Sequence, residues 1–243
     1  MESAYSYGDS NSLWLHSDLL EKLGLAICGQ VWTEGSVIKT EEIELQYNVS
    51  RSVVRETVRV LASMGLVSSR RRVGVFILAT KSWNVYDPKV IRWRLASSDR
   101  ITQLRSLTEL RVAIEPEAAR LAATRAPLTI GTHLLGISNR MREVGREGDQ
   151  KLFLGLDIDF HRTVLVASGN EMFAQLDRLV AEVLSGRTNY GLMPVHPHEA
   201  AVQLHADVAG AIQKGDADFA HDAMHAIMIR TLSEMSTIWK HID

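Results

Sequence analysis

The chain has 243 residues, of which 46% are hydrophobic and 23% are charged, and its formal net charge is −2. This composition is that of a folded globular protein with one large or two modest domains, and it excludes a disordered chain. The single cysteine, Cys28, allows no internal disulfide and fits a reducing compartment. Because the sequence has neither an apolar run of 18 residues nor a signal-peptide pattern, we expect a soluble, cytoplasmic protein that does not contact a membrane.

The first predicted element is a helix from Leu13 to about Gly29, after a polar segment over residues 1–11 that we expect to be mobile. Apolar residues recur in this helix at the spacing of one helical face: Leu15, Leu19, Leu20, Leu23 and Ile27. A second, short helix is expected to open at Thr40, which is a good N-cap and is followed by two acids in the first turn.

A third helix is predicted from Arg51 to about Met64, with Ser50 as its N-cap. Three apolar residues fall on one side of it and should pack inward: Val54, Val58 and Leu61. About 100° round the helix, arginines recur at every fourth position: Arg51, Arg55 and Arg59. An arginine stripe at the start of the second helix of a helix-turn-helix reaches base edges and phosphates in the major groove of DNA.

Two short strands are predicted next, joined by a tip that carries Arg70, Arg71 and Arg72. From Arg51 to Arg72 there are six basic residues and one acid, in a chain whose net charge is only −2. Arginines on a solvated helix are usually surface decoration, but this local excess favours a DNA-binding surface. The residues expected to contact DNA are Ser50, Arg51, Arg55, Arg59, Arg70, Arg71, Arg72 and Gly74.

The predicted fold class is mainly α, with a winged helix-turn-helix over residues 12–78, a linker over residues 79–86 and an all-helical domain over residues 87–243. Asp87 followed by Pro88 is a helix start, with the acid as N-cap. Beyond it, apolar residues recur at helical spacing in segments near 88–96, 100–125, 128–146, 149–167, 171–189, 197–213 and 216–241. These segments predict a bundle of six or seven helices.

Within the bundle, Asp157 and His161 are four residues apart, so both side chains project from one face of a helix. A carboxylate and an imidazole placed in this way can hold one divalent metal ion. His205 can join them if its helix packs face to face with theirs. The alternative is that the three residues are hydrogen-bonded polar groups of the core.

The run V-S-R-x-x-V-R-E, followed by Gly-Leu-Val and by a basic hairpin ending in Gly-Val-Phe-Ile, resembles the DNA-binding domain of the GntR family of bacterial transcription regulators. The resemblance implies that Arg51 and Arg55 contact bases and phosphates and that the hairpin tip enters the minor groove. Many members carry Pro-Ser-Glu-Arg at the start of the preceding helix, where this chain has Ile38-Lys39-Thr40-Glu41. Glu41 stands in place of the arginine, which bears on the operator sequence.

The segments LRVAIEPEAARLAA, LDIDFHRTVLVASGN and LHADVAGAIQKGDADFAHDAM resemble the FCD effector-binding domain of the FadR branch of the same family. The resemblance implies a divalent metal, zinc or nickel, at Asp157, His161 and His205, with a small carboxylate against it. A fourth histidine of that domain is replaced here by Ile227. Arg111 matches an arginine that faces the ligand, or else it pairs with Glu115 at i+4; Arg187 and Arg230 are further candidates for binding the effector.

The favoured interpretation is therefore a transcription regulator, most simply a repressor, that binds operator DNA as a homodimer under the control of a small carboxylate. The segment SWNVYDPKVIRWRL resembles the linker of members that govern aldonate and uronate breakdown, which suggests a sugar acid. The alternative is a metal-dependent enzyme that uses Asp157, His161 and His205. We predict that the protein is not an enzyme, because Asp159 points away from these groups and the arginine-rich hairpin would have no role.

Overall fold

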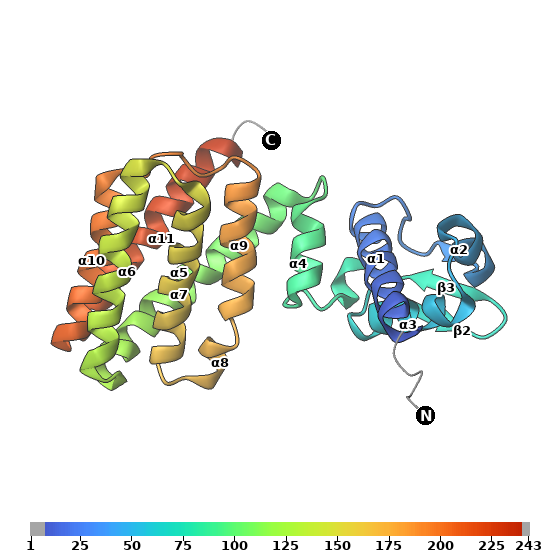
Figure 1. The fold of residues 1–243 in the computed structure, drawn as a ribbon, viewed down its shortest axis with the longest axis horizontal. Helices are drawn as coiled ribbons and strands as arrows, with labels where there is room; N and C mark the ends of the chain where they lie inside the picture. Colours follow the sequence, from blue (N-terminus) through green and yellow to red (C-terminus); the bar gives the residue numbers. More distant parts are fainter. Residues whose placement is uncertain (1–7, 240–243) are drawn as a thin grey trace, which may run out of the picture. The chain divides into compact units, whose positions relative to one another are not determined.

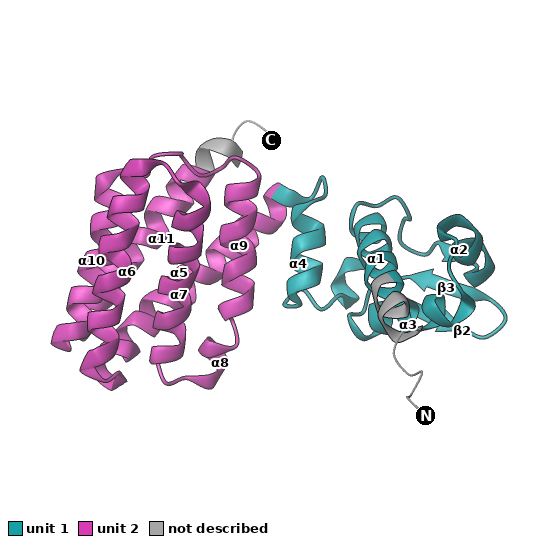
Figure 2. Cartoon of the chain, viewed as in Figure 1, with its two compact units in different colours: residues 1–100 teal, residues 101–243 magenta. Residues whose placement is uncertain are grey.

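The computed structural model describes residues 8–239, with side chains described over residues 15–235 (Figure 1). The chain divides into two compact units, residues 1–100 and residues 101–243 (Figure 2). The mobile segment predicted over residues 1–11 falls partly outside the described residues. Its last part belongs to α1 (Gly8–Cys28), so this helix begins at Gly8 rather than at the predicted Leu13.

The first unit is a winged helix-turn-helix, as predicted. After α1 it contains β1 (Val37–Ile38), α2 (Thr40–Tyr47), α3 (Arg51–Ser63), β2 (Val67–Arg70), β3 (Gly74–Ile77), a 3-10 turn η1 (Thr80–Ser82) and α4 (Pro88–Leu95). The strands form one antiparallel sheet in the order β1-β3-β2. The sequence did not predict β1, because two residues are too few to show an alternating pattern.

The core of this unit is built mostly from the residues that periodicity selected. Val54, Val58 and Leu61 of α3 are buried, and so are four of the predicted apolar residues of α1: Leu19, Leu20, Leu23 and Ile27. Leu15 is an exception, with 41% of its surface exposed, so its predicted place in the core is wrong. At the start of α2, Lys39 rather than Thr40 holds the N-cap position, and its backbone N–H donates to Glu42 Oε2.

Helix α4 packs against α1 and belongs to the first unit. The Trp93 indole is buried, its Nε1 donates to Glu21 Oε2 at 2.6 Å, and Lys89 Nζ lies 2.8 Å from the other oxygen of that carboxylate. A Cβ at Gly24 would lie 2.4 Å from the Trp93 ring, so this glycine allows the close approach of the two helices. The first compact unit therefore extends to residue 100, beyond the linker predicted at residues 79–86.

The second unit is a helical bundle. It comprises α5 (Arg100–Arg125, whose first residue lies in the first unit), α6 (Leu128–Glu147), α7 (Gln150–Ala167), α8 (Glu171–Ala174), α9 (Asp177–Asn189), α10 (Glu199–Lys214) and α11 (Ala217–Trp239). The helix predicted over residues 171–189 is divided into α8 and α9. Helix α6 packs against α7 and α10, α7 against α9, and α10 against α11 (Figure 1). Among the described residues, no helix is both long and apolar enough to cross a membrane.

Candidate functional sites

The arginines of α3 lie on a concave surface of the first unit, which we call the basic groove. It is lined by the start of α2, the exposed face of α3 and residues 69–74 of the hairpin. Ser50 caps α3 by accepting from the Val53 N–H; it does not itself line the groove, whereas Arg51 and Ser52 after it do. Arg51 and Arg55 line the groove and are exposed to solvent.

The hairpin adds three arginines, each held differently. The Arg70 guanidinium lies over the Phe76 ring, 4.8 Å from its centroid. Arg72 has a φ of 65° in the tight turn, and Arg71 is exposed beside it. Gly74 has a φ of 136°, and a Cβ there would lie 2.7 Å from the Ile38 carbonyl oxygen. A glycine is therefore required at position 74 by the backbone conformation and the close approach of β1, besides the predicted contact with DNA.

Arg59 does not share the surroundings of the other two arginines of its stripe. It lies outside the basic groove, and its Nη1 is 3.1 Å from Glu56 Oε2, whereas Arg55, whose Nε lies 3.7 Å from Oε1 of the same carboxylate, lines the groove. Because α3 rotates as it rises, the third arginine of an i, i+4, i+8 stripe turns away from the first. The structure thus brings Arg51 and Arg55 together with residues 70–72, and separates Arg59 from them.

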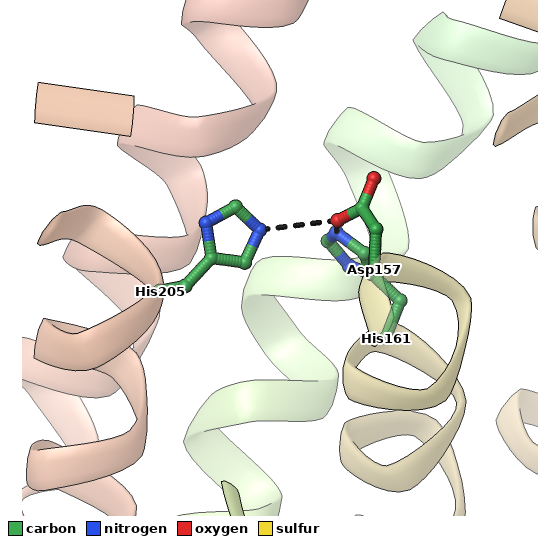
Figure 3. Close-up of side chains that lie close together, drawn as sticks. All are labelled: Asp157, His161 and His205. Carbon is green, nitrogen blue, oxygen red and sulfur yellow. Dashed lines mark ion pairs between the residues drawn. The ribbon is translucent and has the colours of Figure 1, made fainter. Parts of the chain in front are cut away.

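In the second unit, α7 and α10 bring Asp157, His161 and His205 together (Figure 3). All three side chains are buried. Asp157 Oδ1 lies 3.4 Å from His161 Nε2 and 3.3 Å from His205 Nε2, and the three atoms lie within 4.8 Å of one another. Two donors on a tetrahedral zinc ion with bonds of about 2.0 Å are about 3.3 Å apart, so these separations fit a shared metal ligand set.

The other ring nitrogen of each histidine has its own partner. His205 Nδ1 lies 2.9 Å from the Ala201 carbonyl oxygen, which can only accept a hydrogen bond, so this nitrogen carries the proton. His161 Nδ1 lies 2.5 Å from Glu115 Oε2, in an ion-pair contact whose angle is not that of a good hydrogen bond. In a neutral ring, each Nε2 then presents a lone pair to the Asp157 carboxylate. Partners of this kind on Nδ1 are typical of histidines that bind a metal through Nε2.

Glu115 is shared between His161 and Arg111, and all three are 2% exposed. Arg111 Nε lies 2.5 Å from Glu115 Oε1. Burial alone would raise the pKa of Glu115, but the positive charges of Arg111 and His161 outweigh it and hold the pKa at about 2. Burial would lower the pKa of His161, but Glu115 and Asp157 raise it to about 9. The two imidazoles likewise outweigh burial and hold the pKa of Asp157 well below its usual range.

A cavity of about 60 Å³ opens beside these groups. One water needs roughly 10–15 Å³ of such space, so the cavity suits a few waters or a small organic molecule rather than a peptide. The three predicted effector-binding arginines, Arg111, Arg187 and Arg230, all line it, and so does Ile227. Arg111 pairs with Glu115 through Nε and Nη2, yet its Nη1 is buried without a hydrogen-bond partner. Arg187 Nε is likewise buried without a hydrogen-bond partner.

Both parts of the chain match known protein families. Residues 15–77 match the bacterial regulatory proteins of the gntR family, and residues 106–230 match the FCD domain. The chain belongs to the GntR family. It is a transcription regulator, and regulators of this family bind operator DNA as well as small-molecule effectors, the latter through the FCD domain. The alternative of a metal-dependent enzyme is not supported, because the family and the relatives are regulators.

Similar regulators extend over most of the chain. The galactonate operon transcriptional repressor of Escherichia coli K12 is 28% identical, over 88% of this GntR-family protein and 95% of the relative. A probable D-xylose utilization operon transcriptional repressor of Paenarthrobacter nicotinovorans is 27% identical, over 78% of this chain and 75% of the relative. The solved structure of E. coli McbR/YncC has the same fold, with a TM-score of 0.52 at 14% identity, over 94% of this chain and 98% of that one.

Sequence reasoning missed two acids of the second site. Glu115 was considered only as a partner of Arg111, and its contact with His161 joins helices far apart in sequence. Glu234 was not considered at all, although it lines the cavity and lies between Arg187 and Arg230. The spacing of Arg230 and Glu234, at i and i+4, was the one available signal.

Proposed function

We propose that this protein is a homodimeric repressor whose affinity for operator DNA is controlled by a small carboxylate bound in the cavity of the second unit. The carboxylate binds against a divalent metal ion held by Asp157, His161 and His205. A sugar acid is the first candidate for the effector.

The observation that carries the metal site is the direction of the ring nitrogens. Each Nδ1 faces an acceptor, so in neutral rings two Nε2 lone pairs and one carboxylate oxygen converge on the same point. Lone pairs that face one another repel unless a cation or protons lie between them. Without a metal ion, a proton on His161 relieves part of this repulsion, in keeping with the raised pKa of that imidazole, and a single divalent ion would take the place of such protons. His205 Nε2 is also buried without a hydrogen-bond partner.

Two imidazoles and one carboxylate suit zinc or nickel. Ile227, which stands where the resembling domain has a fourth histidine, lines the cavity and cannot bind a metal, so the protein supplies three ligands. Such an ion would have open positions for the oxygens of an effector. Two partners orient the imidazoles that would hold this ion: Glu115 faces His161 Nδ1, and the Ala201 carbonyl oxygen faces His205 Nδ1.

A carboxylate effector is supported by the unpartnered arginine N–H groups. Arg111 Nη1 and Arg187 Nε are buried donors that lack an acceptor. A buried charged donor without a partner costs several kcal/mol relative to a paired one, so an anion in the cavity would be strongly favoured. The name of the galactonate operon repressor supports a sugar acid, in agreement with the resemblance of the linker.

DNA recognition is assigned to the basic groove. Arg51 and Arg55 are placed to read bases and phosphates from α3, and Arg71 to contact the backbone from the hairpin. One small winged domain makes few base contacts, so two-fold symmetry on a near-palindromic operator would double them. Light scattering at micromolar concentration should give a dimer both free and on DNA, and a monomer in both states would contradict the dimer.

The metal is tested by elemental analysis of untagged protein purified without chelators or a nickel column. We expect about one zinc or nickel ion per chain, lost in His161→Ala and Asp157→Asn. The matched control is His225→Ala, which removes an exposed imidazole outside the cavity and should leave the metal content unchanged.

The same variants test the link between metal and effector. His161→Ala should keep operator binding in gel-shift titrations, because the DNA-binding residues lie in the other unit, but lose the response to sugar acids. Substoichiometric metal in the wild type, together with an unchanged effector response in His161→Ala, would overturn this model. The three residues would then be polar groups of the core that need no ion.

A further inference from the structure

The Glu234 carboxylate of α11 lies between two arginines that line the effector cavity. Its Oε2 is 3.3 Å from Arg187 Nη2, and its Oε1 is 3.0 Å from Arg230 Nε. All three side chains line the cavity, and Arg187 is only 3% exposed. One carboxylate of the protein thus already occupies donors from two of the three arginines proposed to bind the effector.

The remaining donors are arranged differently. Arg187 Nε and Arg111 Nη1 are buried without an acceptor, whereas Arg187 Nη2 and Arg230 Nε are matched by Glu234. Both guanidinium groups line the same cavity, and burial together with the charge of Arg111 lowers the pKa of Arg187. The cavity therefore has unmatched donors for one incoming carboxylate and a second set of donors that is already matched.

We propose that Glu234 determines which class of acid the cavity accepts: polyhydroxy monocarboxylates are bound and dicarboxylates are rejected. This inference rests on the proposed function and specifies the effector of the same site. The first carboxylate binds the metal ion and the unmatched donors. At the far end of the ligand, a hydroxyl group donates to Glu234, which as an ionised carboxylate can only accept. A second carboxylate at that end would meet Glu234 as a like charge, or would have to displace it from both arginines.

Local pairing rather than net charge decides this preference. Arg187 Nη2 and Arg230 Nε each make one charge-assisted hydrogen bond to Glu234, so a second anion at this end competes with Glu234 for these two donors. Sites that hydrogen-bond one functional group discriminate strongly against an analogue that leaves the partner unmatched.

The experiment uses three pairs of acids whose members differ only in the terminal carbon, CH₂OH against COO⁻: galactonate and galactarate, gluconate and glucarate, glycerate and tartronate. Dissociation constants are measured by titration calorimetry on the full-length protein loaded with zinc. We expect wild type to bind the monocarboxylate of at least one pair tenfold or more tightly than its dicarboxylate. Glu234→Gln should reduce that ratio at least tenfold, because it removes the like charge, leaves one acceptor oxygen for two arginines and weakens the acceptor for the hydroxyl.

The matched control is Glu199→Gln. Glu199 also bridges two arginines, Arg142 and Arg146, but it faces α6 rather than the cavity, so the ratio should stay at the wild-type value. Melting temperature and zinc content of each variant are measured alongside. The wild-type ratio needs no variant, so the inference is tested even if Glu234→Gln does not fold.

Two results would overturn the role of Glu234 and leave the carboxylate effector standing. One is a dicarboxylate that binds wild type as tightly as its paired monocarboxylate. The other is a ratio that does not change in folded Glu234→Gln. If no member of the three pairs binds the zinc-loaded wild type, the proposed sugar-acid effector itself fails and this inference fails with it.

Discussion

Replacing Glu115 by glutamine removes the negative charge that Arg111 and His161 share. Both partners are 2% exposed, so neither can recover its interactions from water. Glutamine keeps one acceptor oxygen, so it cannot face both Arg111 Nε and His161 Nδ1, and Arg111 Nη1 already lacks a partner. The variant keeps the shape of the side chain, so the change isolates the charge from the packing.

The cost follows from the burial of the pair. Removing one member of a buried ion pair costs about 3–5 kcal/mol, because the other charge is left uncompensated. For a unit of the size of residues 101–243, each kcal/mol corresponds to roughly 2–4 °C in melting temperature, so we expect a decrease of roughly 6–20 °C. Loss of the group that orients His161 through Nδ1 should also weaken metal binding by about 10–100-fold.

Glu117→Gln is the matched control, because Glu117 lies on the same helix and pairs with Arg120 at 2.6 Å. Its side chain is 38% exposed and that of Arg120 is 41% exposed, so solvent screens this pair and its loss should change the stability little. Urea and thermal unfolding followed by circular dichroism give the stabilities, and competition with a zinc-sensitive dye gives the metal affinities.

If the stability of Glu115→Gln lies within about 1 kcal/mol of that of Glu117→Gln, the order of a surface pair, then the Glu115 charge does not compensate Arg111 and His161. A structural role alone is indicated if stability falls and the zinc affinity does not. Replacing both partners, Arg111→Met with Glu115→Leu, should recover part of the stability, since an apolar pair leaves no buried charge unmatched apart from His161.

Arg55→Ala should weaken binding to a specific operator by roughly 1–3 kcal/mol in gel-shift titrations, which is the worth of a good base contact. Arg59 lies outside the basic groove and pairs with Glu56, so Arg59→Ala should weaken binding less. An equal or reversed effect would show that α3 docks in another orientation. Arg71→Ala should weaken specific and non-specific DNA alike and reduce the slope of log K against log salt by about 1; an unchanged slope would remove Arg71 from the phosphate contacts. Ile227→His should tighten zinc binding and weaken the effector, because a fourth protein ligand takes an open position, and calorimetry that finds both affinities unchanged would contradict the placement of Ile227 beside the ion.

The winged helix-turn-helix and the helical bundle could both be predicted from the sequence. Helical periodicity is a local property, so the inward side of α3 and the shared face of Asp157 and His161 follow from spacing alone. Caps are local too, and the Asp87 side chain accepts from the Lys89 N–H as the sequence indicated. The arginine stripe was predicted with less precision, because a spacing of four residues drifts round the helix and leaves Arg59 outside the groove.

Tertiary structure decided the features that depend on how elements meet. The strand β1 exists because β3 offers it a partner, and α4 belongs to the first unit because Trp93 packs on Gly24 and donates to Glu21. In the second unit, the contacts of Glu115 with His161 and of Glu234 with Arg187 join residues 46 and 47 positions apart, from 161 − 115 and 234 − 187. The spacing of residues in a sequence carries no information at such separations. Which side chains share a cavity is set by how the helices pack, and that packing depends on the shapes of all the buried side chains together.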